Sequence, residues 1–187
     1  SVRKIIYTLR ECAGGGGNMC LNVGPKANGD LDPMAVERLE TLGKWLSVHG
    51  EAVYGDMDRT KGRLEVWASH GFWTLKGNTA YLWNLRSYPT NGEMIIGGLD
   101  TPPSRVSIIG CNADLTINHT GLQTIIGNIP LENPEHIAGT PVFRFEFDEK
   151  PKQAIGFFPY SDERFCLGGD AAQAAAMANE SDDNTES

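Results

Sequence analysis

Two helical patterns of apolar residues flank a short apolar run in the first part of the chain. Residues 2–12 place their apolar side chains at the i, i+3, i+4, i+7 spacing of an amphipathic helix: Ile5, Ile6, Leu9 and Cys12. The four glycines at 14–17 are expected to end this helix. A second helix is predicted from Asp32-Pro33, because Asp is a favoured N-cap and Pro suits the first helical turn. His49-Gly50 is expected to close it, with Gly50 in the left-handed conformation.

The run between the helices, residues 18–23, is short, apolar and bounded by turn residues, which predicts a strand buried on both faces. The order is then helix, glycine loop, strand, polar loop 26–30 and helix, which is half of a βα unit. Such units belong in parallel sheets with further strands on both sides. This chain offers few further units of this kind. We therefore expect residues 1–55 to be the last piece of a larger α/β domain and the sequence to be part of a longer protein.

Asn22 is the one candidate binding residue, because ligands meet parallel sheets at the carboxyl ends of their strands. A hydrogen bond to a neighbouring loop is the more common role for any single residue in such a place, and both interpretations stay open. The glycines at 14–17 do not form a phosphate loop, since they follow a helix and precede a strand. A calcium loop from Asp56 fails because Lys61 stands where its glycine belongs.

The pattern changes near residue 70. Short apolar and aromatic segments alternate with Gly, Pro and Asn turns, and they fall at 72–75, 80–83, 94–96, 106–109, 115–117, 122–126 and 142–147. In the last one Arg144 and Glu146 alternate with aromatic residues and are expected to face outward. Many short strands at close spacing predict an antiparallel β-sandwich over residues 71–152, after a linker at 56–70. The acidic, low-complexity composition at the end predicts a disordered tail over 153–187.

The charge distribution and the cysteine content restrict the classes of function that the chain can have. The formal net charge is −8, but residues 154–187 hold seven acids and one base, so this stretch carries −6 and the rest only −2. A nearly neutral folded part lacks the basic stripe that nucleic-acid binding requires. No apolar run approaches the roughly 20 residues of a membrane span. The four cysteines and four histidines show no metal-binding spacing, and no metal or cofactor is expected; a Cys111–Cys166 disulfide is an open alternative to free thiols.

The stretch from the glycine loop to the end of the second helix resembles a known family. The residues that carry the resemblance are Gly17-Asn18-Met19-Cys20-Leu21-Asn22-Val23-Gly24-Pro25, Gly29-Asp30, Glu37-Arg38-Leu39, Gly43-Lys44-Trp45-Leu46 and Gly50-Glu51-Ala52-Val53-Tyr54-Gly55. They resemble the end of the catalytic domain of family-29 glycoside hydrolases, the α-L-fucosidases. The strand segments after residue 72 resemble that family's C-terminal β-sandwich, so the resemblance covers about the first four-fifths of the chain. Met19-Cys20 and His49 depart from the family's usual leucines and asparagine.

The resemblance implies a mixed fold, in which the last helix–strand–helix of a (β/α)8-type barrel precedes the sandwich. It also implies a retaining exo-glycosidase that releases terminal α-L-fucose from glycans through two carboxylates. In the family those carboxylates lie upstream of this stretch, so no catalytic residue is expected in this chain, and Asp30, Asp32 and Glu51 are not assigned as such. By the same resemblance the longer protein would act outside the cytoplasm, in a secreted, periplasmic or lysosomal setting.

Two other functions are compatible with the second half of the chain. A stand-alone carbohydrate-binding module would use aromatic residues to stack on sugar: Trp67, Trp73, Tyr81, Trp83 and Tyr88. We favour instead that Trp73, Tyr81 and Trp83 alternate into the sandwich core, because large aromatics dominate core burial. A purely structural domain that braces the barrel is the other alternative. Asn118-His119-Thr120 and Asn179-Glu180-Ser181 also fit the N-glycosylation pattern, which matters only for a secreted protein.

Overall fold

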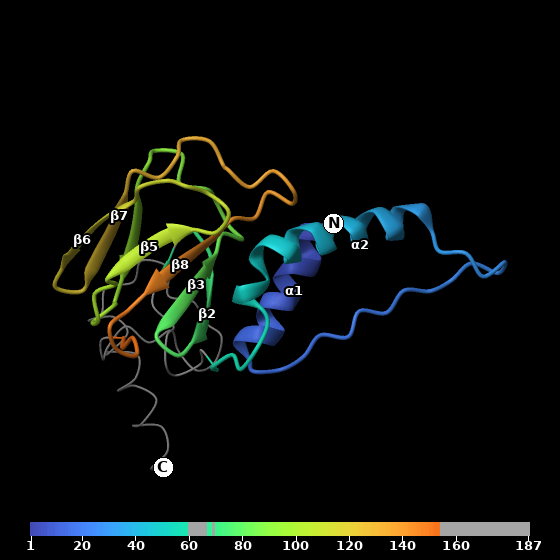
Figure 1. The fold of residues 1–187 in the computed structure, drawn as a ribbon, viewed down its shortest axis with the longest axis horizontal. Helices are drawn as coiled ribbons and strands as arrows, with labels where there is room; N and C mark the ends of the chain where they lie inside the picture. The colour runs from blue at the N-terminus through green and yellow to red at the C-terminus, as the bar shows by residue number, and fades with distance from the viewer. Residues whose placement is uncertain (60–66, 69, 154–187) are drawn as a thin grey trace, which may run out of the picture.

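Two helices lie against one face of a two-layered β-sandwich (Figure 1). The computed structural model describes residues 1–59, 67, 68 and 70–153. The helices are α1 (Val2–Gly14) and α2 (Pro33–His49), and a 3-10 turn, η1 (Gly50–Ala52), follows α2. The strands are β1 (Trp67–Ala68), β2 (Phe72–Lys76), β3 (Thr79–Trp83), β4 (Met94–Gly97), β5 (Arg105–Ile108), β6 (Thr116–Thr120), β7 (Gln123–Gly127) and β8 (Val142–Glu146).

The strands form two antiparallel four-stranded sheets, with the orders β1-β4-β7-β6 and β2-β3-β8-β5. Alternate side chains of both sheets fill the space between them, as in a β-sandwich. The largest of these fully buried residues are Leu75, Leu82, Met94, Ile96, Leu99, Ile108, Phe143 and Phe145. The antiparallel β-sandwich class predicted from the sequence is therefore confirmed, and each predicted strand segment overlaps a strand; only β1, two residues long, was not predicted. The tail expected at 153–187 and the thiol of Cys166 lie outside the described residues, apart from Gln153, which pairs with Leu99.

The prediction that Trp73, Tyr81 and Trp83 alternate into one sandwich core is only partly right. Trp73 packs inside the sandwich, edge-on to Phe145 with ring centroids 5.0 Å apart. Tyr81 and Trp83 point to the opposite face of their sheet, into a second core beneath the helices. The reason is register: Trp73 pairs with Leu82, so the odd-numbered residues of β3 face away from the interior that Leu82 enters. All three aromatics are at most 4% exposed, so they form no sugar-stacking surface.

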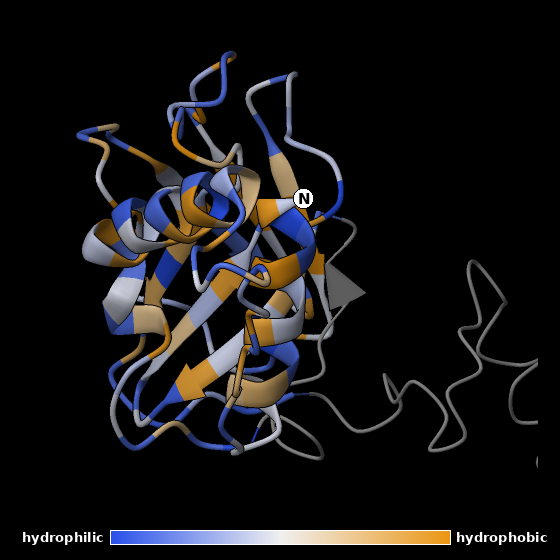
Figure 2. Ribbon diagram, turned by 90° about the vertical axis from the view of Figure 1, so that its right-hand side faces the viewer, coloured by the Kyte–Doolittle hydropathy of each residue, from blue (hydrophilic) through white to orange (hydrophobic). Residues whose placement is uncertain are grey.

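Trp45 of α2 is the centre of this second core. Its indole is fully buried and contacts Trp83, with ring centroids 5.4 Å apart. Its Nε1–H donates to the carbonyl of Thr140, 2.9 Å away, in the loop that leads into β8. Ile6 of α1 and Leu42 of α2 complete the apolar contact. In Figure 2, apolar segments of the helices alternate with polar ones, as expected for helices with one buried side. The sheet β2-β3-β8-β5 thus packs on the other sheet with one face and, around Tyr81, Trp83 and Val142, on the helices with the other.

Glu135 fixes the loop that receives Trp45. Its carboxylate is almost buried and accepts hydrogen bonds from the backbone N–H groups of Ile137 at 2.6 Å, Ala138 at 3.1 Å and Thr140 at 2.7 Å. Bonds from several N–H groups to one carboxylate are stronger than neutral ones. They hold Thr140 in place, so its carbonyl is positioned to accept from Trp45.

Both ends of α2 depend on local contacts. At the start Asp32 is the N-cap, as predicted, and its Oδ1 accepts from the N–H of Met34 at 2.9 Å. At the end the prediction for Gly50 is wrong: its φ is −58°, because η1 continues the turn, and the left-handed conformation falls on Gly55 with φ 96°. His49, the last residue of α2, is buried and stacked on Trp45 at 4.6 Å.

The predicted strand at 18–23 is also wrong for this structure, since these residues form no strand. They lie in an extended, mostly exposed segment between the helices (Figure 1). A strand needs neighbours that accept and donate main-chain hydrogen bonds. No described segment is paired with residues 18–23, so the apolar pattern alone does not produce a strand.

The pH dependence of stability follows from His49. Burial lowers the pKa of its imidazole below the ordinary 6.5, and the hydrogen bond to the Trp45 carbonyl and the carboxylates of Glu135 and Glu51 only partly oppose this. Below pH 6.5 the unfolded chain therefore binds a proton that the folded chain does not, so the free energy of unfolding should fall as the pH drops from 7 to 5. For one proton the slope is at most about 1.4 kcal/mol per pH unit. Urea unfolding at several pH values measures it.

His49→Phe should keep the stacking on Trp45 and flatten this slope, while the exposed His136→Gln should leave it unchanged. If the free energy of unfolding depends on pH equally in His49→Phe and in the unmodified chain, a group other than His49 causes the loss of stability at low pH.

Candidate functional site

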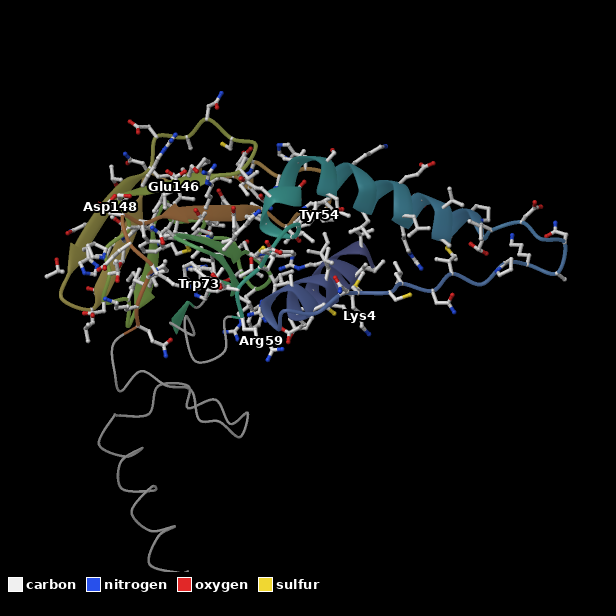
Figure 3. All side chains as sticks on the ribbon, turned by 60° about the horizontal axis from the view of Figure 1, so that its bottom comes forward. Lys4, Tyr54, Arg59, Trp73, Glu146 and Asp148 are labelled. Carbon is white, nitrogen blue, oxygen red and sulfur yellow. The ribbon has the colours of Figure 1, made fainter. Side chains whose placement is uncertain are left out.

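The most unusual feature of the structure is an arm, which we define as residues 15–32, that projects beyond the sandwich together with the start of α2 (Figure 1). It leaves the end of α1 at Gly15 and returns to α2 at its N-cap, Asp32. Large apolar side chains are exposed on it and just after it: Leu21 is 43% exposed, Leu31 42% and Met34 59%. Figure 3 shows the side chains of this region standing away from the rest of the molecule. Arg59 lies against Gly16 at the base of the arm, whereas Leu21, Leu31 and Met34 leave exposed apolar surface farther along it.

Asn22 lies on this arm and is exposed. Among residues 1–59, 67, 68 and 70–153 its side chain has no hydrogen-bond partner, so the neighbouring-loop role considered for it is not seen in the described part of the chain. Its amide is free to donate and accept. Whether it meets a substrate stays a prediction.

The tip of the arm is an ordered polar turn. The N–H of Lys26 donates to the carbonyl of Asp30 at 2.7 Å, and the amide of Asn28 donates to the Asp30 carboxylate at 2.7 Å. Lys26 also forms an ion pair with Asp32 at 3.9 Å. The carboxylates of Asp30 and Asp32 thus stabilise the turn and the helix start, which are structural roles.

Glu51 has a different environment, on the outer face of the sheet β2-β3-β8-β5. Its carboxylate lies 3.6 Å from the guanidinium of Arg144, which also pairs with Glu146 at 2.8 Å. Burial raises the pKa of the Tyr81 hydroxyl nearby, and the negative charge of Glu51 adds to this effect. This is an ion-paired surface on which one guanidinium is shared by two carboxylates.

Metal chemistry finds no support in the described ranges, since they contain no group of three His, Cys, Asp or Glu side chains placed to hold an ion. Two of the histidines have ordinary partners: His70 Nδ1 lies 2.7 Å from the carbonyl of Ser87, and His119 Nδ1 lies 2.9 Å from the hydroxyl of Thr124. Within the same ranges no helix has the length and apolarity to cross a membrane.

The contacts that hold α2, which follows the arm, against the sandwich were not predicted from the sequence. Glu135 gave one local signal, Asn133-Pro134-Glu135, in which Asn133 Oδ1 accepts from the N–H of Glu135 at 3.0 Å. The Trp45–Thr140 hydrogen bond spans 95 residues and leaves no local signal.

Comparisons with known proteins agree on one family. A sequence model of the family described as alpha-L-fucosidase matches residues 1–51. Human tissue alpha-L-fucosidase is 33% identical over 117 residues, which cover 60% of this chain and 24% of that protein. The mouse tissue enzyme is 30% identical over 132 residues, covering 68% of this chain and 28% of that protein.

Solved structures agree in fold. The crystal structure of Thermotoga maritima alpha-fucosidase in complex with fucose superposes with a TM-score of 0.65 at 30% identity, over 78% of this chain and 34% of that one. The alpha-L-fucosidase from Vibrio sp. strain EJY3 gives a TM-score of 0.68 at 21% identity, over 82% of this chain and 27% of that one, and supports the fold alone. The chain thus spans 24–34% of the length of these four relatives. Over the part that it shares with them, it belongs to the alpha-L-fucosidase family.

Proposed function

We propose that this chain is one part of a longer, retaining α-L-fucosidase that hydrolyses terminal α-L-fucose from glycans. A retaining glycosidase needs two carboxyl groups about 5–5.5 Å apart, one as nucleophile and one as acid/base. Asp30, Asp32 and Glu51 already serve a turn, a helix cap and an ion pair. The resemblance to family-29 glycoside hydrolases implies that both catalytic carboxylates lie upstream of this stretch, so we place them outside residues 1–187, and the reaction requires no cofactor.

The observation that carries this proposal is the exposed apolar arm. Residues 18–23 have the composition of a buried strand but are mostly exposed, and Leu21 and Leu31 are 43% and 42% exposed. Fully burying an exposed side chain of this size is worth about 1.5–3 kcal/mol, and these partly exposed side chains gain a fraction of that once the arm is covered. In our proposal the rest of the catalytic domain covers it, and residues 18–23 then join a parallel sheet as a strand.

The sandwich acts as a brace in this proposal. It buries Trp45 and Ile6, and so holds α1 and α2, from which the two ends of the arm emerge. Asn22 would then stand near the carboxyl end of the arm's strand, where its amide could reach a hydroxyl of the substrate or of a catalytic loop.

The direct test is hydrolysis of a chromogenic aryl α-L-fucoside. The chain alone should be inactive, and the longest natural protein that contains it should be active, because only the latter would hold both carboxylates. Activity in the chain alone would show that an acid assigned here to a structural role is catalytic. Inactivity of the longer protein, under conditions where it is folded, would contradict the proposal.

Replacing Asn22 tests its role in the longer protein. Asn22→Ala should lower kcat/KM about three- to tenfold, since a lost uncharged hydrogen bond costs about 0.5–1.5 kcal/mol. Asn112→Ala, at an exposed position of the sandwich, is the matched control and should leave kcat/KM unchanged. Equal kcat/KM values for both variants would assign Asn22 no part in the reaction.

Amide hydrogen exchange tests whether the arm becomes a strand. Peptides covering residues 18–23 should exchange rapidly in the isolated chain and slowly in the longer protein, because only there would their N–H groups be bonded. Peptides covering β8, a central strand, should be protected in both samples. Rapid exchange of 18–23 in both would mean that the rest of the protein does not cover the arm.

A further inference from the structure

The strand β6 ends one sheet of the sandwich. In the sheet order β1-β4-β7-β6 it pairs with β7 on one side, from Thr116 opposite Gly127 to Thr120 opposite Gln123. No described strand pairs with its other side. It therefore presents a row of free main-chain N–H and C=O groups, which is the kind of edge on which another chain's strand can add. In Figure 1, β6 lies at the end of the molecule opposite α2 and the arm.

The side chains of β6 divide cleanly between its two faces. Thr116, Asn118 and Thr120 are exposed, while Ile117 and His119 are half-buried. His119 reaches the buried hydroxyl of Thr124 at 2.9 Å, which fixes it on the inner side. Its two neighbours are therefore held on the solvent side by the alternation of the strand.

Those neighbours complete an N-glycosylation pattern, Asn118-His119-Thr120. The Thr120 hydroxyl lies 3.5 Å from Asn118 Oδ1, so the two groups of the pattern are adjacent on one face. Asn118 Nδ2 is on an exposed residue, and the backbone around it is extended. An enzyme can reach the amide there without unfolding the core.

We propose that Asn118 is an N-glycosylation site and that its glycan shields the outer edge of β6. In this step Asn118 Nδ2 attacks the anomeric carbon of an oligosaccharide carried on a lipid diphosphate. The C–N bond forms as the bond between the anomeric carbon and the diphosphate oxygen breaks, the amide loses one proton, and the lipid diphosphate leaves; nothing is oxidised or reduced. A bulky hydrophilic chain at this position hinders the approach of a second strand to the edge. This inference is independent of the proposed fucosidase activity.

The test uses the full chain, expressed behind a secretion signal in a eukaryotic host that N-glycosylates. The glycan is removed with peptide N-glycosidase in ¹⁸O-labelled water, and mass spectrometry then reads the peptide that contains residue 118. We expect Asn118 to be converted to ¹⁸O-labelled Asp. Asn118→Gln and Thr120→Val should each remove one glycan from the intact mass, whereas Thr120→Ser and the control Asn112→Gln should keep it.

Asn179 provides an internal comparison, because it carries the same sequence pattern outside the described residues. An unlabelled Asn118 overturns the proposal, whether or not Asn179 carries a glycan. The shielding is measured by sedimentation velocity: removing the glycan should raise the fraction of associated species, and adding Thr116→Lys to Asn118→Gln should lower it again, because a lysine on an edge strand opposes pairing. Identical sedimentation with and without the glycan would contradict the shielding of the β6 edge but not the glycosylation of Asn118.

Discussion

The buried indole of Trp45 joins the helices to the sandwich, because it packs on Trp83 and donates to the Thr140 carbonyl. Glu135 holds the loop that carries this carbonyl. A buried carboxylate costs several kcal/mol in lost hydration, and here three backbone N–H groups offset that cost. The Glu135 carboxylate thus fixes the loop in which the Thr140 carbonyl accepts a hydrogen bond from the Trp45 indole, 95 residues away in the sequence.

This junction explains why one sheet has two apolar faces. β3 is buried along almost its whole length, because Ala80 and Leu82 enter the sandwich while Tyr81 and Trp83 enter the core beneath the helices. The Trp83 indole also donates to the Thr74 hydroxyl at 2.9 Å, and that hydroxyl donates to the carbonyl of Ala52 in η1 at 3.2 Å. These two hydrogen bonds, together with the apolar contacts, tie η1, β2 and β3 into one unit.

The features that sequence predicted well are those with local causes. The N-cap at Asp32 needs only its own turn, and the alternation in β8 needs only its own side chains. The contacts between Arg144 and Glu51 and between Trp45 and Thr140 could not be predicted, because they join distant segments and leave no periodic signal. Gly50 was misjudged for a related reason: η1 continues the chain beyond α2, and a helix end has no left-handed glycine when a further turn follows it.

The arm and β6 are two places in the described residues where extended chain has unpaired main-chain groups, and their side chains distinguish what can cover each. Around Asn22 the arm carries Leu21 and Val23, so water is a poor partner for it and a protein surface is a good one. The exposed face of β6 carries Thr116, Asn118 and Thr120, which water or a glycan solvates well. The apolar run at 18–23 therefore tells what kind of surface can cover it, even though these residues form no strand in this structure. In our proposal, the strands that would pair with residues 18–23 lie in the rest of the catalytic domain.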